Sequence, residues 1–592
     1  MSARESFSWI EVDCDGCSLT FGTGACTAAL GVDGVTRKCF NTFNTCRKTA
    51  DYSHMPVYRT MRYCQPRSNM PKGATFFPLL VGDPSEHSAT VNIAGSDGDL
   101  SAFGRRATIS ARFIDAPDHD RYFDKYQSER VSGAAQSDGI GYKPVEQGTH
   151  FAKLKSRWPF YAGRAMRRCD GYIVDGAIVD VTTRHYVITN MSGPGDDMMV
   201  TVEGSDVLDL ADDKRTRAPK ASNGKLLADV TIGGLDTFTL SPTGIGALEY
   251  PASGRARIGS EFVDYTRSGD VITLTSRAVS QTVASTHRSG DTFQRVLRYE
   301  NARVDDVVSE LLQEAGIDAS YLPLVDWAAE VNRWMAGTTL TRDIGEPTGV
   351  KALASQIVPL GFSLFWDGAV QKIRFKANRP VDGDTIWDLS DLSTNLDIQI
   401  EEDDKKRVSE VLFWTVQKTP AGSATDTNNY ARTWVASDPS AREEWRYRTG
   451  AIKSYTCPWL NRGADAIVRV AARRLLKRFD TTPVYATITL DAKWNAIQLT
   501  DVVRLRTRGL QDDTGREIEG LFQVTQRSEP RAGERIKIVV QSYQFAGRFA
   551  YATANDSPIY ALATPAQRDP GMFACDPITL KMPDGSPPYE AI

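Results

Sequence analysis

Short runs of apolar residues, many of them alternating with polar ones, recur along most of this chain and predict β-strands. In the first half the runs are broken by Asp, Gly and Pro, and they fall at residues 89–94, 107–114, 171–174, 186–189 and 198–202. Towards the C-terminus they fall at residues 408–416, 484–490, 501–505, 522–525 and 536–543. Strands of this length and spacing are typical of barrels or sandwiches.

A helical period replaces this pattern in the middle of the chain. Residues 302–315 place six apolar side chains on one face, with Asp305 and Asp306 in the first turn and Gly316 after the last, which predicts a helix. Residues 350–360 predict a second helix, and residues 362–376 predict a hairpin around an Asp-Gly turn. Two helices and a hairpin make a compact α+β unit.

Three further segments complete the predicted elements. Residues 148–164 predict a short amphipathic element that packs on the first β-region, and residues 464–479 predict a basic helix. Residues 250–279 predict a hairpin within a small β module. The expected fold class is therefore multidomain, mainly β with α+β parts.

Changes in pattern and composition suggest six regions. They are a Cys-rich module (1–66), a first β-barrel (67–225), a small β decoration module (226–298), a helix-helix-hairpin domain (299–382), a second β-barrel with one basic helix (383–555) and a Pro-rich C-terminal extension (556–592).

Charge and motifs exclude several classes of function. The 592 residues carry a formal net charge of −4, whereas a protein that tracks a nucleic-acid backbone has a basic stripe. The six histidines are scattered singly, and no Walker loop, nucleophile elbow or His-Glu-x-x-His motif is present. We therefore expect no enzymatic activity and no catalytic residue.

The cysteines provide the strongest candidate chemistry. Five of the nine lie between Cys14 and Cys46, Cys64 follows shortly after, and Gly- and Asn-bearing loops separate the thiols. A disulfide framework suits small secreted domains without a core. A zinc site usually brings two Cys-x-x-Cys pairs, and only Cys14 and Cys17 have that spacing here. An iron–sulfur cluster needs four thiolates that converge from irregular loops. Spacing alone leaves zinc and iron–sulfur level.

The residues around the cysteines resemble a known pattern. Leu-Thr-Phe-Gly and Ala-Cys-Thr-Ala are followed by Lys-Cys-Phe-Asn-Thr, by Thr-Cys and by a tyrosine. This run is similar to the cysteine module of lambda-like tail-tip proteins from siphophages, the bacteriophages with long, non-contractile tails. The resemblance implies a [4Fe-4S] cluster, with zinc as the alternative. The implied ligands, for cofactor and metal alike, are Cys17, Cys26, Cys39 and Cys46, with Tyr52 as the trailing aromatic.

Cys14 and Cys64 lie outside the matched pattern, and we interpret both as small buried thiols. Residues 321–337 and 371–380 also resemble the central hub proteins of phage tails. Together these likenesses imply a structural virion protein at the distal end of the tail, assembled in the bacterial cytoplasm, with the two barrels as hub barrels and the cluster as a structural staple.

The partners implied by the resemblance are those of a homotrimeric hub. They are two further copies of the chain, the distal tail and tail-tube ring proteins, other tail-tip and fibre proteins and the tape-measure protein. Phage DNA would only pass through, as the hub closes or opens the channel for genome ejection, and contact with the host surface would be indirect. Two alternatives remain open, an iron–sulfur oxidoreductase and a zinc-stabilised receptor-binding fibre protein.

Overall fold

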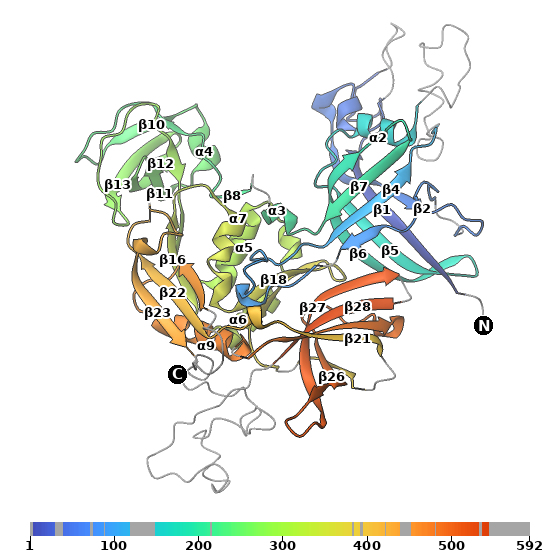
Figure 1. Ribbon diagram of the computed structural model, residues 1–592. Helices are drawn as coiled ribbons and strands as arrows, with labels where there is room; N and C mark the ends of the chain where they lie inside the picture. Colours follow the sequence, from blue (N-terminus) through green and yellow to red (C-terminus); the bar gives the residue numbers. More distant parts are fainter. Residues whose placement is uncertain are drawn as a thin grey trace, which may run out of the picture.

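The computed structural model of the protein describes residues 4–29, 39–71, 75–87, 89–118, 148–212, 216–381, 384–390, 395–420, 422–437, 452–479, 481–531 and 535–543. Several β-sheets surround a small group of helices (Figure 1). The predicted fold class, multidomain and mainly β with α+β parts, is confirmed. The predicted extension 556–592 lies outside the described residues. Within those residues, no helix combines the length and the apolar character needed to cross a bilayer.

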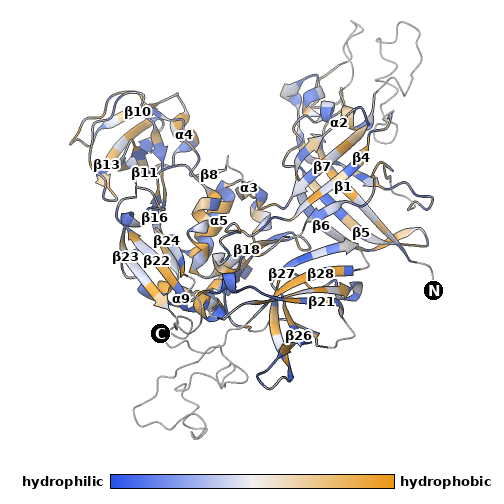
Figure 2. Cartoon of the chain, viewed as in Figure 1, coloured by the Kyte–Doolittle hydropathy of each residue, from blue (hydrophilic) through white to orange (hydrophobic). Residues whose placement is uncertain are grey.

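A seven-stranded sheet holds the N-terminal part of the chain, in the order β2-β1-β5-β6-β7-β4-β3. Its strands are β1 (Glu5–Cys17), β2 (His54–Cys64), β3 (Ser85–His87), β4 (Thr108–Ile114), β5 (Ala165–Val174), β6 (Ala177–Ser192) and β7 (Met199–Ser205). Apolar positions alternate with polar ones along these strands (Figure 2). Helix α2 (His150–Arg157) adds Phe151 and Leu154 to the core of this sheet, which confirms the predicted amphipathic element.

The strands on either side of the cysteine loops belong to this sheet. β1 pairs with β2 on one side and with β5 on the other. Ile10 and Val12 of β1 and Met61 of β2 lie in the same core as the later strands. The sequence places a domain boundary at residue 66, whereas in the structure the cysteine loops are an excursion between two neighbouring strands.

The small β module is a six-stranded sheet in the order β14-β11-β12-β13-β10-β9. Its elements are β9 (Lys225–Leu226), β10 (Thr237–Ser241), helix α4 (Ile245–Glu249), β11 (Ser253–Ile258), β12 (Glu261–Ser268), β13 (Val271–Val279) and β14 (Phe293–Arg295). Glu261 is fully buried there and accepts hydrogen bonds from Arg277 and His287 at 2.7 and 2.8 Å. Burial opposes ionisation of Glu261, but these bonds outweigh it and lower its pKa to about 2.

We expect Glu261→Gln to lower the free energy of unfolding by about 1–3 kcal/mol, because glutamine is uncharged and replaces one of the two oxygens that accept from Arg277 by a donor group. A depressed pKa stabilises the fold above the unfolded-state pKa. The advantage of the wild type should therefore be complete above about pH 4.5 and disappear as the pH falls to about 2. Thermal unfolding of both proteins across this range measures it. Equal curves at neutral pH would contradict the prediction, and Glu249→Gln on the surface of the module is the control.

Helices at the centre of the molecule pack with the strand pairs β15–β16, β17–β8 and β18–β19 around the largest apolar core. The elements are α3 (Asp209–Asp212), β8 (Arg217–Ala218), β15 (Leu297–Arg303), α5 (Val304–Glu314), α6 (Leu324–Trp334), β16 (Thr339–Ile344), β17 (Thr348–Gly349), α7 (Val350–Ser355), β18 (Phe362–Asp367) and β19 (Lys372–Ala377). The predicted helix at 302–315 and the hairpin at 362–376 are confirmed as α5 and as β18 with β19. The second predicted helix, at 350–360, forms α7 and then a 3₁₀ turn (Val358–Leu360).

The region predicted as one second barrel divides into two parts. A six-stranded sheet in the order β20-β26-β27-β28-β25-β21 has its own core. Its strands are β20 (Ile386–Leu389), β21 (Asn395–Glu402), β25 (Val484–Asp491), β26 (Val502–Gln511), β27 (Glu517–Arg531) and β28 (Arg535–Ser542).

The second part of this region is a three-stranded sheet that precedes helix α9. Its elements are β22 (Glu410–Gln417), β23 (Tyr430–Ser437), β24 (Ile452–Cys457) and α9 (Asp465–Phe479). Val411 and Phe413 of β22 and Leu475 of α9 bury their side chains in the central core with α5. This packing corrects the prediction of a single barrel over residues 383–555, because the apolar face of α9 lies against the three-stranded sheet and the central helices.

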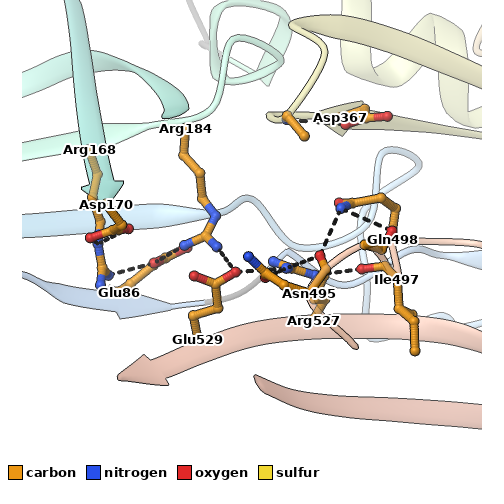
Figure 3. Close-up of polar contacts among 12 residues, drawn as sticks. Glu86, Arg168, Asp170, Arg184, Asp367, Asn495, Ile497, Gln498, Arg527 and Glu529 are labelled. Carbon is orange, nitrogen blue, oxygen red and sulfur yellow. Dashed lines mark hydrogen bonds and ion pairs between the residues drawn. The ribbon is translucent and has the colours of Figure 1, made fainter. Parts of the chain in front are cut away.

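A buried ionic network joins the first and last sheets (Figure 3). Arg184 of β6 pairs with Glu86 of β3 at 3.1 Å and with Glu529 of β27. Glu86 also pairs with Arg168 at 2.8 Å, and Glu529 pairs with Arg527 at 2.7 Å. A cavity of about 320 Å³ adjoins these residues. Because paired charges inside a protein demand defined geometry, the network fixes how the two sheets meet.

Candidate metal centre

The cysteine segment leaves the first sheet at the end of β1 and returns at the start of β2. Cys17, the last residue of β1, lies opposite His54, the first residue of β2. The amide of Cys17 donates to the carbonyl of Asn41 at 2.7 Å. The sheet therefore fixes both ends of residues 18–53, and turns within the segment position the remaining cysteines.

Two tight turns end at Cys26 and Cys46. The amide of Cys26 donates to the carbonyl of Thr23 at 3.2 Å, and the amide of Cys46 donates to the carbonyl of Phe43 at 3.1 Å. Each bond spans three residues, as in a tight turn. Both thiols thus follow a closed turn, which restricts where they point.

Asn41 connects the loop that carries Cys39 to the end of β1. Its φ of 57° lies in the left-handed region, which asparagine tolerates better than most residues. Its side-chain amide donates to the carbonyls of Leu19 at 3.1 Å and Cys17 at 3.4 Å. Asn41 of the motif therefore has a structural reason.

The four predicted ligands line one cavity together with Tyr52. Cys17 and Cys39 are buried, and Cys26 and Cys46 are half-buried. No disulfide joins any two of the eight cysteines that the structure describes. The structure thus brings together the same four thiols that the resemblance indicates.

The other described cysteines lie in apolar cores. Cys14 packs in the core of the first sheet, and Cys64 and Cys169 share a smaller cluster on its other face. Burial raises the pKa of Cys14 to about 12 and that of Cys64 to about 11. Since a thiol binds a metal as the thiolate, these environments suit inert core residues. Cys575 lies outside the described residues.

The lining of the cavity suits a negatively charged group bound by thiolates. Arg47 and Lys48 contribute positive charge to it. The carboxylate of Asp51 is already bonded to the amide and hydroxyl of Thr27, at 2.7 and 2.8 Å. The hydroxyl of Tyr52 is buried and has no hydrogen-bond partner among the described residues. An unsatisfied buried donor beside four thiols fits a group with acceptor sulfurs.

The arrangement of the thiols bears on the kind of group. A zinc ion holds its sulfur ligands about 2.3 Å from one point. In the described part of the chain, no three His, Cys, Asp or Glu side chains are arranged to hold a single ion. A four-iron cube, in contrast, binds each thiolate to a different iron atom. Thiols are ligands that both zinc and a four-iron cluster accept, so the residue type of the cavity suits either group.

Helix α2 anchors the cysteine segment to the first sheet. The side-chain amide of Asn44 donates to the carbonyl of Ser156 at 2.8 Å. The guanidinium carbon of Arg157 lies 3.8 Å from the centre of the Phe40 ring. The indole of Trp158 donates to the carbonyl of Asp15 at 2.8 Å. The sequence does not predict the contacts between α2 and the cysteine segment, because about a hundred residues of chain separate the two.

No protein-family model and no curated protein matches the chain. Among solved structures it is similar to a tail protein from Neisseria meningitidis MC58, with 12% identity over 64% of this chain and 88% of that one and a TM-score of 0.32. It is similar to the 43 kDa tail protein of prophage MuSo2 from Shewanella oneidensis, with 9% identity over 78% and 96% of the chains and a TM-score of 0.33. It is also similar to a Francisella PdpA-VgrG complex, with 8% identity over 92% and 59% and a TM-score of 0.34. Because all of these TM-scores are below 0.5, the proposed function rests on the cysteine site and not on these structures.

Proposed function

We propose that this chain is a structural protein of a siphophage tail tip, in which Cys17, Cys26, Cys39 and Cys46 hold a [4Fe-4S] cluster. The observation that carries the proposal is the convergence of these four thiols on one cavity beside Tyr52, within a run of residues that resembles tail-tip proteins. When bound, the cluster supplies iron–sulfur bonds that crosslink the segment.

The role of the cluster in this proposal is to hold the cysteine segment in shape. Among the described residues of 18–53, none belongs to an apolar core cluster. A segment without a core needs covalent or metal crosslinks to stay ordered. With both ends fixed by β1 and β2, the four thiols would complete the constraint.

In the full proposal, three copies form the central hub, join the tail tube to the fibre proteins and surround the passage through which the genome leaves. Closed cyclic symmetry is a common solution for such assemblies. Mass measurement in solution tests the trimer, and a stable monomer would contradict it. Imaging of phage particles with a label on this chain tests its position. Label along the tail shaft instead of at the distal end would contradict the tip assignment.

Purification without oxygen, followed by assays of iron and acid-labile sulfide, tests the cluster. We expect about four of each per chain and a brown colour that a chelator and oxygen remove together. Detection of zinc instead of iron would show that the site holds the alternative metal ion and not a cluster. A colourless protein with disulfides among these cysteines would contradict any metal role.

Tyr52→Phe tests whether the tyrosine hydroxyl serves the bound group. We expect the variant to bind iron and sulfide, with a more negative midpoint potential and faster bleaching in air, because hydrogen bonds to the sulfurs stabilise the reduced cluster. Redox titration followed by absorbance or electron paramagnetic resonance measures it. Tyr58→Phe on β2 is the control. An unchanged potential would show that the hydroxyl faces no cluster sulfur.

A further inference from the structure

A polar cavity of about 250 Å³ lies far along the chain from the cysteines, where three parts of the protein meet. The small β module contributes Arg255 and Ser280, and the β15–β16 pair contributes Arg298 and Arg342. The third part is the three-stranded sheet with the chain that follows its strands, and it contributes Gln417, Pro420, Pro458 and Asn461. A ligand in this cavity would therefore contact all three parts.

Two of the three arginines in the cavity have carboxylate partners. Arg255 pairs with Asp264 at 2.7 Å and with Asp343 at 2.6 Å. Arg298 pairs with Glu300 at 2.8 Å, and both side chains are exposed at the rim. The charges of these residues are matched within the protein.

Arg342 differs because no carboxylate in the described chain pairs with it. Its Nη1 donates to Oε1 of Gln356, which also accepts from the indole of Trp459 at 3.2 Å. Its guanidinium carbon lies 5.0 Å from the centre of the Trp459 ring. The amide and the ring are both neutral, so they leave the positive charge of this half-buried side chain without a counter-charge.

An unmatched cation inside a protein is unfavourable. Burial lowers the pKa of Arg342 to about 10, as expected for a guanidinium that no anion stabilises. Arg342 lines the cavity, and a guanidinium carries its N–H groups in a planar fork. Such a fork matches two oxygens of a carboxylate or a phosphate.

We propose that this cavity binds an oxyanion through Arg342. The shared chemistry is a pair of oxygens with negative charge, supplied either by inorganic phosphate or by the acidic side chain of a bound polypeptide. Bound there, the anion would neutralise Arg342 and link the small β module to the β15–β16 pair and to the three-stranded sheet with the chain that follows its strands.

Calorimetric titration of the full-length protein with inorganic phosphate, and separately with N-acetylglutamate amide, tests the proposal at ionic strength held constant with chloride. We expect saturable binding of at least one probe and a rise in unfolding temperature that saturates with it. The better probe identifies the source. Absence of binding of both probes to the wild type would overturn the proposal.

Variants locate the binding. Arg342→Gln should weaken the affinity about tenfold or more, and Arg298→Gln, the matched rim variant, should change it little. Arg342→Lys keeps the charge and loses the fork, so it should bind with intermediate affinity and provides the readout if Arg342→Gln does not fold. Unchanged affinity in both Arg342 variants, or loss of binding in Arg298→Gln alone, would overturn the assignment to Arg342.

Discussion

Replacing Cys39 by serine is expected to remove the iron and sulfide from the purified protein and to abolish its brown absorbance. Cys39 is the buried thiol of the loop that Asn41 connects to β1. Its loss leaves three thiolates for a group that needs four. Metal binding to a segment without a core is folding free energy, on the order of 10 kcal/mol for small zinc modules, so residues 18–53 should become sensitive to protease.

Cys169→Ser is the matched control for Cys39→Ser. Cys169 is also buried, but it lies in an apolar cluster of the first sheet away from the cavity. The iron content of the Cys169→Ser variant should equal that of the wild type. Retention of full iron and protease resistance in Cys39→Ser would contradict the ligand assignment. Loss of colour with fully infectious particles would contradict the structural role and would leave the assignment of the ligands intact.

Glu529→Gln is expected to lower the free energy of unfolding by about 3–5 kcal/mol, because it leaves the buried Arg527 without a carboxylate partner in the described chain and leaves Arg184 with Glu86 alone. Glu529 is 2% exposed and pairs with Arg184 and Arg527 from the two sheets that it joins. Denaturant unfolding measures the change. Glu519→Gln on the same strand is the control. Its side chain is 52% exposed and lies 3.9 Å from Arg504, so we expect a change below about 1 kcal/mol.

The effect of Glu529 also depends on pH. Burial opposes its ionisation, but Arg184 and Arg527 outweigh burial and lower the pKa of Glu529 below its usual 4.5. The stability that it contributes is therefore complete above about pH 4.5 and is lost as the pH falls through the lowered pKa. Equal stability of Glu529→Gln and wild type at neutral pH would show that the network does not hold the sheets together.

Local sequence pattern predicts the elements whose signals are local. The apolar face of α5 and the Asp-Gly turn between β18 and β19 are examples. The predicted strand at residues 89–94 is wrong. There the side-chain amide of Asn92 donates to the carbonyls of Asp97 and Ser101, both at 3.0 Å, and Ile93–Gly95 forms a 3₁₀ turn. Side-chain bonds to nearby backbone compete with strand pairing.

Helix α6 is missing from the predicted elements, although its pattern is present in the sequence. Trp327, Val331 and Trp334 recur at helical spacing and are all buried.

For the candidate site too, the sequence predicts what lies close together in the chain and misses the contacts between distant residues. The motif indicates the four thiols, whose convergence the structure supplies. The anchoring by α2 and the contact of Glu86 and Arg184 with Glu529 join residues far apart in the chain. Such pairings depend on how sheets pack, which no local spacing encodes.

The cysteine loops begin and end at residues that face each other, Cys17 and His54, on one antiparallel strand pair. The sheet therefore demands only that these two positions meet, and it places no requirement on the length or content of what lies between them. We therefore expect this point of the chain to accept insertions, deletions or a different metal-binding sequence without a change in the first sheet. The fold below the cysteine loops thus depends on the pairing of β1 with β2 and not on the sequence inserted between them.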